Sequence, residues 1–182
     1  MYHLILVKHS LPEVLPDVPA KDWHLSEEGR RRCKVLAGQL AFYRPAIFSS
    51  VEPKAVETAS LLSSSLGLSF QTVEGLHEHD RSGVGWLGPD ELKAAAARFF
   101  SQPDQLVFGQ ETATQACERF TKAVEAILDK SPQQDVLLVT HGTVITLFLA
   151  YYTKVEPFPL WESLDLPAFA ILPLPLVQGP YS

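Results

Sequence analysis

The segment Leu4-Ile5-Leu6-Val7-Lys8-His9-Ser10 decides which fold the sequence predicts. Its apolar run is followed at once by a charged residue, a histidine and a hydroxyl. A short apolar run of this kind is typical of a strand buried in a parallel sheet, and such sheets bind their ligands beyond the carboxyl ends of the strands. A histidine next to a lysine is weak evidence for catalysis when it stands alone. The segment therefore predicts a buried strand that ends at a pocket, with His9 as a candidate site residue.

Two further apolar runs also end in polar residues. The run from Val136 to Thr140 leads into His141-Gly142, and the short run 46–48 leads into Ser49-Ser50. Lys54 lies at the start of the helix expected after the second of these runs. Because the carboxyl ends of parallel strands meet at one edge of a sheet, we expect His9, His141 and the start of that helix to face one crevice.

Strand and helix patterns alternate along the rest of the chain. Ser26 is a typical helix N-cap, Pro53 suits the first turn of a helix, and Gly67 suits the residue after its end. Alternating strands and helices predict a single α/β domain over residues 1–182, with three layers in which helices cover both faces of a mostly parallel sheet. We expect strands at 3–8, 46–48, 68–73, 136–140 and 168–172, helices at 27–44, 53–66, 89–100, 112–130 and 143–152, loops at 10–24, 74–88 and 101–111, and a surface tail from Pro173 onward.

The composition is that of an ordinary globular protein without a large basic surface. The chain has 182 residues, a formal net charge of −6 and a pI of about 5.5, so we expect neither nucleic acid nor a membrane as its partner. Residues 136–153 carry no formal charge, but the polar segment 140–143 interrupts them and favours a strand, a turn and a buried helix over a membrane span. No signal peptide is recognisable at the N-terminus, and Cys33 and Cys117 are expected to be buried thiols of a cytoplasmic protein.

Short motifs, in order along the chain, resemble those of the histidine phosphatase (phosphoglycerate mutase-like) superfamily. They are Leu6–Ser10 (like the Arg-His-Gly signature), Leu25–Arg30 (L-T-x-x-G), Ser49–Ala59 (S-x-x-x-R-A-x-E-T-A), Leu76–Glu78 (L-x-E), Gly109–Thr112 (G-E-S) and Val139–Gly142 (the second histidine). The resemblance implies a phosphoglycerate mutase-like fold and a metal-independent phosphatase that needs no cofactor.

The resemblance also implies a role for each site residue. His9 would attack phosphorus and form a phosphohistidine, His141 would donate a hydrogen bond to the phosphoryl oxygens, and Glu78 would act as the proton donor and acceptor. The residues expected to bind the substrate are Lys8, Ser10, Lys54, Arg81 and Gly142. The predicted substrate is a small phosphorylated metabolite.

Two lysines separate this sequence from the family pattern. Lys8 and Lys54 stand where the family has arginine, and Ser10 stands where it has glycine. Lysine keeps the charge but loses the planar fork that grips a phosphoryl group at two points. Arg81 is a candidate replacement guanidinium, and a solvated loop arginine is the alternative. A second function therefore stays open, in which the protein binds a phosphorylated ligand or partner without efficient turnover.

Other readings of the site also stay open. A mutase is less favoured, because 182 residues leave little room for the inserts of the mutases. A phosphohistidine-protein phosphatase is also less favoured, but it is the nearer competitor, because the small members of the superfamily that this chain resembles include such enzymes. The cluster His77-Glu78-His79-Asp80 resembles a set of metal ligands, although exposed loop residues explain it better. Asp80 is the fallback proton donor if Glu78 points away. The sequence leaves the oligomeric state open, a homodimer included.

Overall fold

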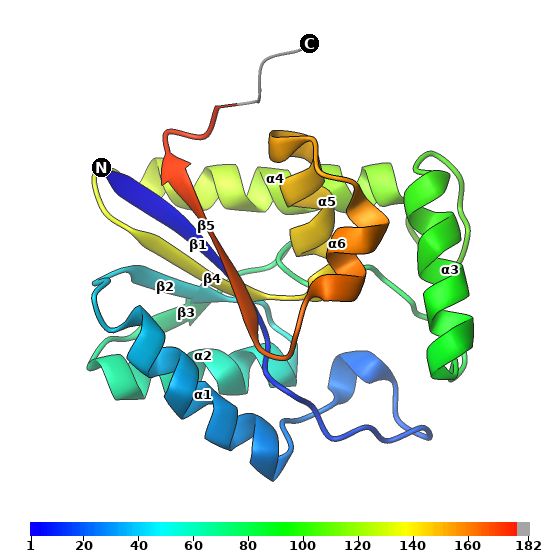
Figure 1. Cartoon of the computed structure of the whole chain (residues 1–182), viewed down its shortest axis with the longest axis horizontal. Helices are drawn as coiled ribbons and strands as arrows, with labels where there is room; N and C mark the ends of the chain where they lie inside the picture. The colour runs from blue at the N-terminus through cyan, green and yellow to red at the C-terminus, as the bar shows by residue number, and fades with distance from the viewer. Residues whose placement is uncertain (178–182) are drawn as a thin grey trace.

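The strands form one five-stranded sheet in the order β3-β2-β4-β1-β5. The computed structural model describes residues 1–177, so residues 178–182 of the predicted domain lie outside the described part. β1, β2, β3 and β4 run parallel to one another, and β5 runs antiparallel to β1 at one edge (Figure 1). The strands are β1 (Tyr2–Lys8), β2 (Ala46–Ser49), β3 (Phe70–Thr72), β4 (Val136–Thr140) and β5 (Ala168–Leu174).

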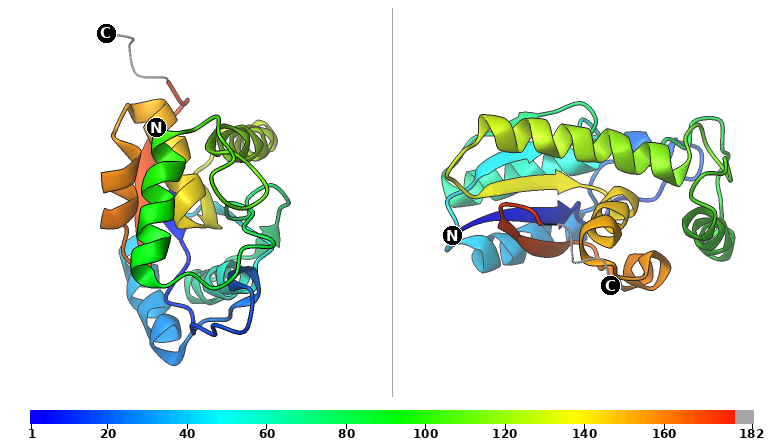
Figure 2. Two further views of the ribbon diagram at one scale, coloured as in Figure 1. Left: turned by 90° about the vertical axis from the view of Figure 1, so that its right-hand side faces the viewer. Right: turned by 90° about the horizontal axis from the view of Figure 1, so that it is seen from above.

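Helices cover both faces of this sheet (Figures 1 and 2). They are α1 (Glu27–Leu40), α2 (Pro53–Leu66), α3 (Pro89–Ser101), α4 (Ala113–Lys130), α5 (Gly142–Thr153) and α6 (Pro157–Ser163), with a short 3-10 helix, η1 (Ala20–Asp22), after β1. Within residues 1–177, none of them combines the length and the apolar character that crossing a membrane requires.

Alternating side chains of β1 build a core on each face of the sheet. Ile5 and Val7 lie among the apolar residues of α1 and α2, whereas Leu4 and Leu6 lie among those of α4 and α5. All four side chains are fully buried. Successive residues of a strand point to opposite faces, so an unbroken apolar run is what a strand covered on both sides requires. The predicted three-layer α/β architecture is confirmed.

α3 stands beyond the carboxyl ends of the strands (Figure 2). Its Phe99 and Phe100 form a separate apolar cluster with Ala113 and Ala116 of α4, and Trp161 of α6 packs against this cluster. The segment that joins β3 to α3 carries Glu78. This small cluster therefore anchors one end of the loop that was expected to hold the catalytic acid.

Prolines caused two errors near the carboxyl terminus. α6 was not predicted, because Pro157 and Pro159 suggested irregular chain, yet both lie in the first turn, where a helix needs no backbone donor. β5 continues through Pro173 and Leu174 instead of ending before them. Pro173 is tolerated because β5 is an edge strand and one missing N–H there breaks no second ladder.

Two other boundaries were predicted too wide. α1 ends at Leu40, whereas the predicted helix ran to residue 44, and β3 covers only Phe70–Thr72. Pro45 sets the latest residue at which α1 can end, but it does not determine where the last turn ends, because the ends of helices fray. β3 is also an edge strand with a single neighbour, β2, so fewer residues are held in the ladder.

The first turn of α1 packs directly on the chain that follows His9. Ser26 Oγ accepts a hydrogen bond from the Gly29 N–H at 3.0 Å and donates one to the Leu11 carbonyl oxygen at 3.0 Å. A Cβ atom on Gly29 would lie 2.1 Å from that same carbonyl oxygen. Only glycine permits this approach, which explains the glycine of the Leu25–Arg30 motif.

The two glycines of α1 give a matched test of this contact. Gly29→Ala should lower the free energy of unfolding by about 1–3 kcal/mol, because a methyl group is forced against backbone. Gly38→Ala should raise it by about 0.5–1 kcal/mol, because nothing lies within 4 Å of a Cβ there and alanine suits a helix better. Urea denaturation of both variants measures the difference. Equal effects would show that α1 does not rest on Leu11 as described.

Candidate active site

Three neighbouring strands deliver the central residues of the site. His9 follows β1, His141 follows β4 and Ser50 follows β2. Lys8 pairs in register with Thr140, so the two histidines that come next lie side by side, with ring centroids 5.2 Å apart. Ser50 Oγ lies 2.8 Å from His141 Nε2. The structure thus brings together the strand ends that the sequence placed around one crevice.

His9 is held as a neutral and oriented imidazole. Its ring is buried, and its Nδ1 lies 2.8 Å from the backbone carbonyl oxygen of Ser10. A carbonyl oxygen only accepts, so Nδ1 carries the proton and Nε2 carries the lone pair. Burial lowers the pKa of His9 well below its usual value, and the nearby His141 and Lys54 lower it further. His9 therefore offers a nucleophilic nitrogen at neutral pH.

His141 is fully buried between His9 and Ser50. Burial, followed by the charge of Lys54, lowers the pKa of His141 well below its usual value. Its Nδ1 is buried and has no hydrogen-bond partner within residues 1–177. An unpaired buried polar atom costs free energy. This nitrogen therefore has unused capacity for one hydrogen bond.

The Glu78 carboxylate lies against the start of α5. Its Oε1 accepts a hydrogen bond from the His79 N–H at 2.9 Å, and its Oε2 accepts one from the Thr143 N–H at 3.1 Å. Burial raises the pKa of Glu78, but the nearby His141 and Arg81 and the two backbone donors outweigh burial, so its pKa lies below the ordinary value. Glu78 is therefore ionised at neutral pH, at the positive end of a helix.

Both lysines of the site already contact neighbouring groups. Lys8 Nζ donates to the Leu164 carbonyl oxygen at 2.7 Å, and burial lowers the pKa of Lys8. Lys54 Nζ donates to the Ala20 carbonyl oxygen at 2.7 Å and pairs with the Glu52 carboxylate. An ammonium group has three donors, so each lysine keeps capacity for an anion. Neither offers the two-point grip of a guanidinium.

Ser10 and Gly142 form parts of the wall of the site. The buried Ser10 hydroxyl donates to the Gly29 carbonyl oxygen at 2.8 Å, and the Ser10 N–H donates to Thr58 Oγ1 at 3.0 Å. Gly142 is the first residue of α5, and a Cβ atom on it would lie 3.2 Å from Lys8 Cε. The side chain of Ser10 is thus hydrogen-bonded to α1, and the aliphatic part of the Lys8 side chain lies next to Gly142.

Arg119 of α4 holds the loop that carries Glu78. Its guanidinium donates to three backbone carbonyl oxygens of this loop, at 2.8 Å on Gly75, 2.9 Å on His77 and 3.2 Å on Glu78. It also grips both carboxylate oxygens of Glu111, at 2.5 and 3.1 Å. Glu111 in turn accepts from the Asp80 N–H at 3.0 Å. Arg119 and Glu111 therefore fix the loop on both sides of Glu78.

Gly109 lets the next segment approach the same loop. The Gln110 N–H donates to the Asp80 carbonyl oxygen at 2.8 Å. Gly109 has a φ of 83°, and a Cβ atom on it would lie 2.2 Å from that oxygen. The glycine of the Gly109–Thr112 motif is thus required by backbone geometry.

The cluster His77-Glu78-His79-Asp80 does not converge on one point. The His79 ring packs against Phe99 and Phe108, with centroids 4.3 and 4.8 Å away. The Asp80 carboxylate accepts from a backbone N–H of its own loop at 2.8 Å. Within residues 1–177, no three His, Cys, Asp or Glu side chains are grouped as metal ligands. The described part of the chain thus gives the metal-site reading no support.

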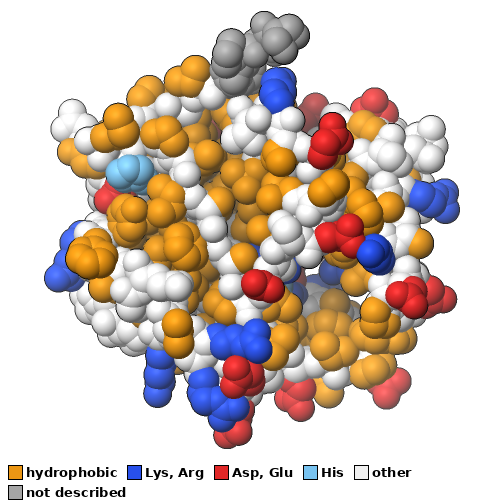
Figure 3. Space-filling model, viewed as in Figure 1, with side chains coloured by type: hydrophobic (Ala, Val, Ile, Leu, Met, Phe, Trp, Pro, Cys, Tyr) orange, Lys and Arg blue, Asp and Glu red, His pale blue; other side chains and the backbone are white. Residues whose placement is uncertain are grey.

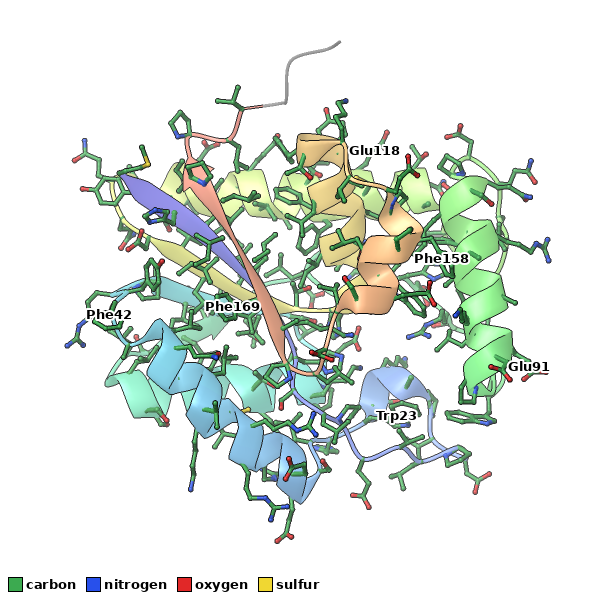
Figure 4. The ribbon with its side chains drawn as sticks, viewed as in Figure 1. Trp23, Phe42, Glu91, Glu118, Phe158 and Phe169 are labelled. Atoms are coloured by element: carbon green, nitrogen blue, oxygen red, sulfur yellow. The ribbon has the colours of Figure 1, made fainter. Side chains whose placement is uncertain are left out.

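Two tryptophans join the loops beside the site. Trp23 and Trp86 have ring centroids 5.9 Å apart, and Trp86 is about half exposed. Figure 3 shows a hollow on this side of the molecule, with basic side chains visible within it, and Figure 4 shows Trp23 on the loop below. The aromatic pair ties the loop after β1 to the loop before α3.

Glu52 and Arg119 also contribute to the site, although no sequence pattern marks them. Glu52 is only 8% exposed, its Oε1 accepts from the Glu78 N–H at 2.9 Å, and the same oxygen lies 3.5 Å from His141 Nε2. A lone glutamate before a helix is ordinarily a surface residue, so no pattern marked it. An arginine in an amphipathic helix likewise gives no sign that it reaches a loop.

Arg119→Gln tests whether this arginine positions Glu78. The change removes the charged donor to three carbonyl oxygens and the ion-pair partner of Glu111, so the free energy of unfolding should fall by about 3 kcal/mol or more. Lys122→Gln, which removes one positive charge from an exposed position of the same helix, should change it by less than about 0.5 kcal/mol. Chemical denaturation compares the two variants, and a similar small effect for both would contradict the positioning role.

Comparison with known proteins finds relatives over most of the chain. The sequence profile of the histidine phosphatase superfamily (branch 1) matches residues 5–171. Phosphoglycerate mutase-like protein 4 of Arabidopsis thaliana is 25% identical over 145 residues, which make up 75% of this chain and 62% of that protein. The chain therefore spans less than two thirds of the length of this relative.

Solved structures share the fold at low sequence identity. Mycobacterial glucosyl-3-phosphoglycerate phosphatase superposes with a TM-score of 0.76 and 22% identity, over 93% of this chain and 89% of that chain. Phosphoserine phosphatase of Entamoeba histolytica, in complex with 3-phosphoglyceric acid, superposes with a TM-score of 0.76 and 18% identity, over 94% and 90%. These likenesses establish the fold of the described chain.

Proposed function

The chain belongs to the histidine phosphatase superfamily, and on that premise we propose that it is a phosphomonoesterase that hydrolyses a small phosphorylated metabolite through a phosphohistidine on His9. The observation that carries the proposal is the fixed tautomer of His9, with its lone pair on Nε2, beside the unpaired Nδ1 of His141. Solved structures of the same fold come from phosphatases that are named for phosphorylated metabolites, which supports the substrate class.

In the first step, His9 Nε2 attacks phosphorus. The N–P bond forms while the bond between phosphorus and the ester oxygen breaks, and the leaving oxygen takes a proton from Glu78. Glu78 is ionised in the free protein, and the negative phosphoryl group raises its pKa when it binds nearby. His141 Nδ1–H donates to a phosphoryl oxygen, while its Nε2 accepts from the Ser50 hydroxyl.

In the second step, water attacks phosphorus and releases His9. The Glu78 carboxylate takes a proton from the water, the O–P bond forms and the N–P bond breaks. Inorganic phosphate leaves, and His9 returns as a neutral ring with Nδ1 bonded to Ser10. Atoms and charges balance without another reactant.

Positive charge from the chain itself stabilises the transferring group in this proposal. Lys8, Lys54 and Arg81 supply cations, and α5, which begins at Gly142, supplies backbone N–H groups at its positive end. Phosphoryl transfer needs mainly positioning and charge neutralisation. No metal or cofactor is required, and the Ser10 backbone contributes by holding His9.

The engagement of both lysines favours a second candidate function. Lys8 and Lys54 each already donate to a backbone carbonyl oxygen. A pocket that grips the phosphoryl group at single points could bind a phosphorylated ligand or partner without turning it over efficiently.

Replacement of His9 separates these two functions. His9→Ala should lower the rate of aryl phosphate hydrolysis about a thousandfold or more, because the nucleophile is lost. His24→Ala, which changes an exposed histidine on the loop after β1, should leave the rate within about twofold. Activity of the natural protein should survive a strong chelator.

Three results would contradict the phosphatase proposal. Full activity of His9→Ala would exclude His9 as the nucleophile. Absence of turnover on a phosphate ester panel, with vanadate still raising the melting temperature, would favour the binding function. Loss of activity with chelator alone would point to metal chemistry.

A pair of carboxylate replacements identifies the proton donor. Glu78→Gln should lower kcat about 10²- to 10⁴-fold, as expected for loss of a general acid. Asp80→Asn should lower it less than about threefold, because the Asp80 carboxylate is bonded to its own loop backbone. Steady-state kinetics on one aryl phosphate compares them, and the reverse order would assign the acid to Asp80.

A further inference from the structure

A buried carboxylate that the proposed mechanism does not use lies inside the phosphoryl pocket. Glu52 is 8% exposed and Lys54 is 5% exposed, and the two side chains form an ion pair. The other carboxylate oxygen of Glu52 contacts the Glu78 N–H at 2.9 Å and lies 3.5 Å from His141 Nε2. A carboxylate inside a pocket that binds an anion lowers the affinity of the pocket for that anion. Glu52 is therefore expected to have a function that offsets this cost.

Glu52 is held in place by the backbone around it. It lies in the turn between β2 and α2, directly before Pro53, which fixes the first turn of the helix. If its side chain left the pocket, the Glu78 N–H would lose its acceptor and Lys54 would lose its ion pair. Both losses are costly in a buried site. These losses disfavour movement of the Glu52 side chain out of the site.

The net charge of the groups around the pocket can be balanced by one negative charge on a ligand. Glu52 faces Lys54 from α2, His141 from the end of β4, and His77 and the Glu78 backbone from the loop after β3. The remaining charged groups are Lys8, Glu78 and Arg81. Asp165 also lies near Lys8, but its side chain is exposed, so water screens its charge and it is not counted with the buried groups. His9 and His141 are neutral. Lys8, Lys54 and Arg81 thus oppose Glu52 and Glu78, an excess of one positive charge among the charged groups near His9 and His141.

We propose that Glu52 is a resident anion that shares Lys54 with the phosphoryl group, so that the site accepts a phosphoryl group together with one proton. The proposal rests on the proposed phosphatase function and deepens it. A phosphoryl dianion alone would leave a buried excess of negative charge, whereas a dianion with one added proton matches the pocket. The proton resides either on a phosphoryl oxygen or on Glu78. From either group, the proton can pass to the leaving oxygen of the substrate. The proton taken up on substrate binding is then the one that the leaving oxygen receives.

Calorimetric titration with inorganic phosphate tests this proton uptake directly. The full chain is titrated above the second pKa of phosphate in two buffers that differ in ionisation enthalpy. The natural protein should take up about one proton per phosphate bound, and its affinity should fall about tenfold per pH unit in this range. Glu52→Gln should bind phosphate with almost no proton uptake, and at least about tenfold more tightly at the highest pH. Glu52→Leu, which keeps a similar volume, should behave alike.

Glu57→Gln is the matched control. It also removes one carboxylate from α2, but Glu57 pairs with Arg30 and His24 outside the pocket. Proton uptake and phosphate affinity should match those of the natural protein within about twofold.

The possible results separate this inference from the proposed function. Phosphate binding by the natural protein without proton uptake would overturn the role of Glu52, whether or not its variants fold. Proton uptake by Glu52→Gln or Glu52→Leu that equals the uptake by the natural protein would also overturn the role of Glu52. Failure of the natural protein to bind phosphate at any pH would instead reject the phosphatase proposal itself.

Discussion

The hydrogen bond from His9 Nδ1 to the Ser10 carbonyl oxygen, at 2.8 Å, is the contact on which the proposed chemistry depends. It fixes one tautomer and leaves the lone pair on Nε2. Burial keeps the ring neutral, because an imidazolium in this place would lose its hydration beside His141 and Lys54. A single short contact thereby sets the position, the direction and the protonation state of the proposed nucleophile.

The rest of the fold holds this ring in place from several directions. β1 and β4 are buried on both faces, so the two histidines follow paired strands in the buried interior of the sheet. The Ser10 hydroxyl is bonded to Gly29 of α1, and its N–H is bonded to Thr58 of α2. On the far side, Arg119 fixes the loop of Glu78 through backbone carbonyl oxygens. The site is thus supported by backbone contacts more than by side-chain pairs.

Sequence patterns predicted the layers of the fold and the histidines at the strand ends. The spacing of apolar residues and the polar residues that follow each strand are local properties of the chain, so they can be recognised in the sequence. They could not predict α6 or the end of β5, because whether a proline is tolerated depends on its place in a helix or sheet. Glu52 and Arg119 were missed for a related reason. Their roles arise from contacts between distant segments, such as Glu52 with the Glu78 N–H and Arg119 with the His77 carbonyl oxygen, and no local pattern records such contacts.

The state of His9 is open to direct measurement by nitrogen-15 NMR of the histidine rings in the free protein. Between about pH 6 and pH 8, the spectrum should show a His9 ring that stays neutral, with the proton on Nδ1 and an unprotonated Nε2. His24, which is exposed, serves as the internal reference. A His9 ring that is charged in this range, or that carries its proton on Nε2, would contradict the central claim that the fold presents His9 as a ready nucleophile.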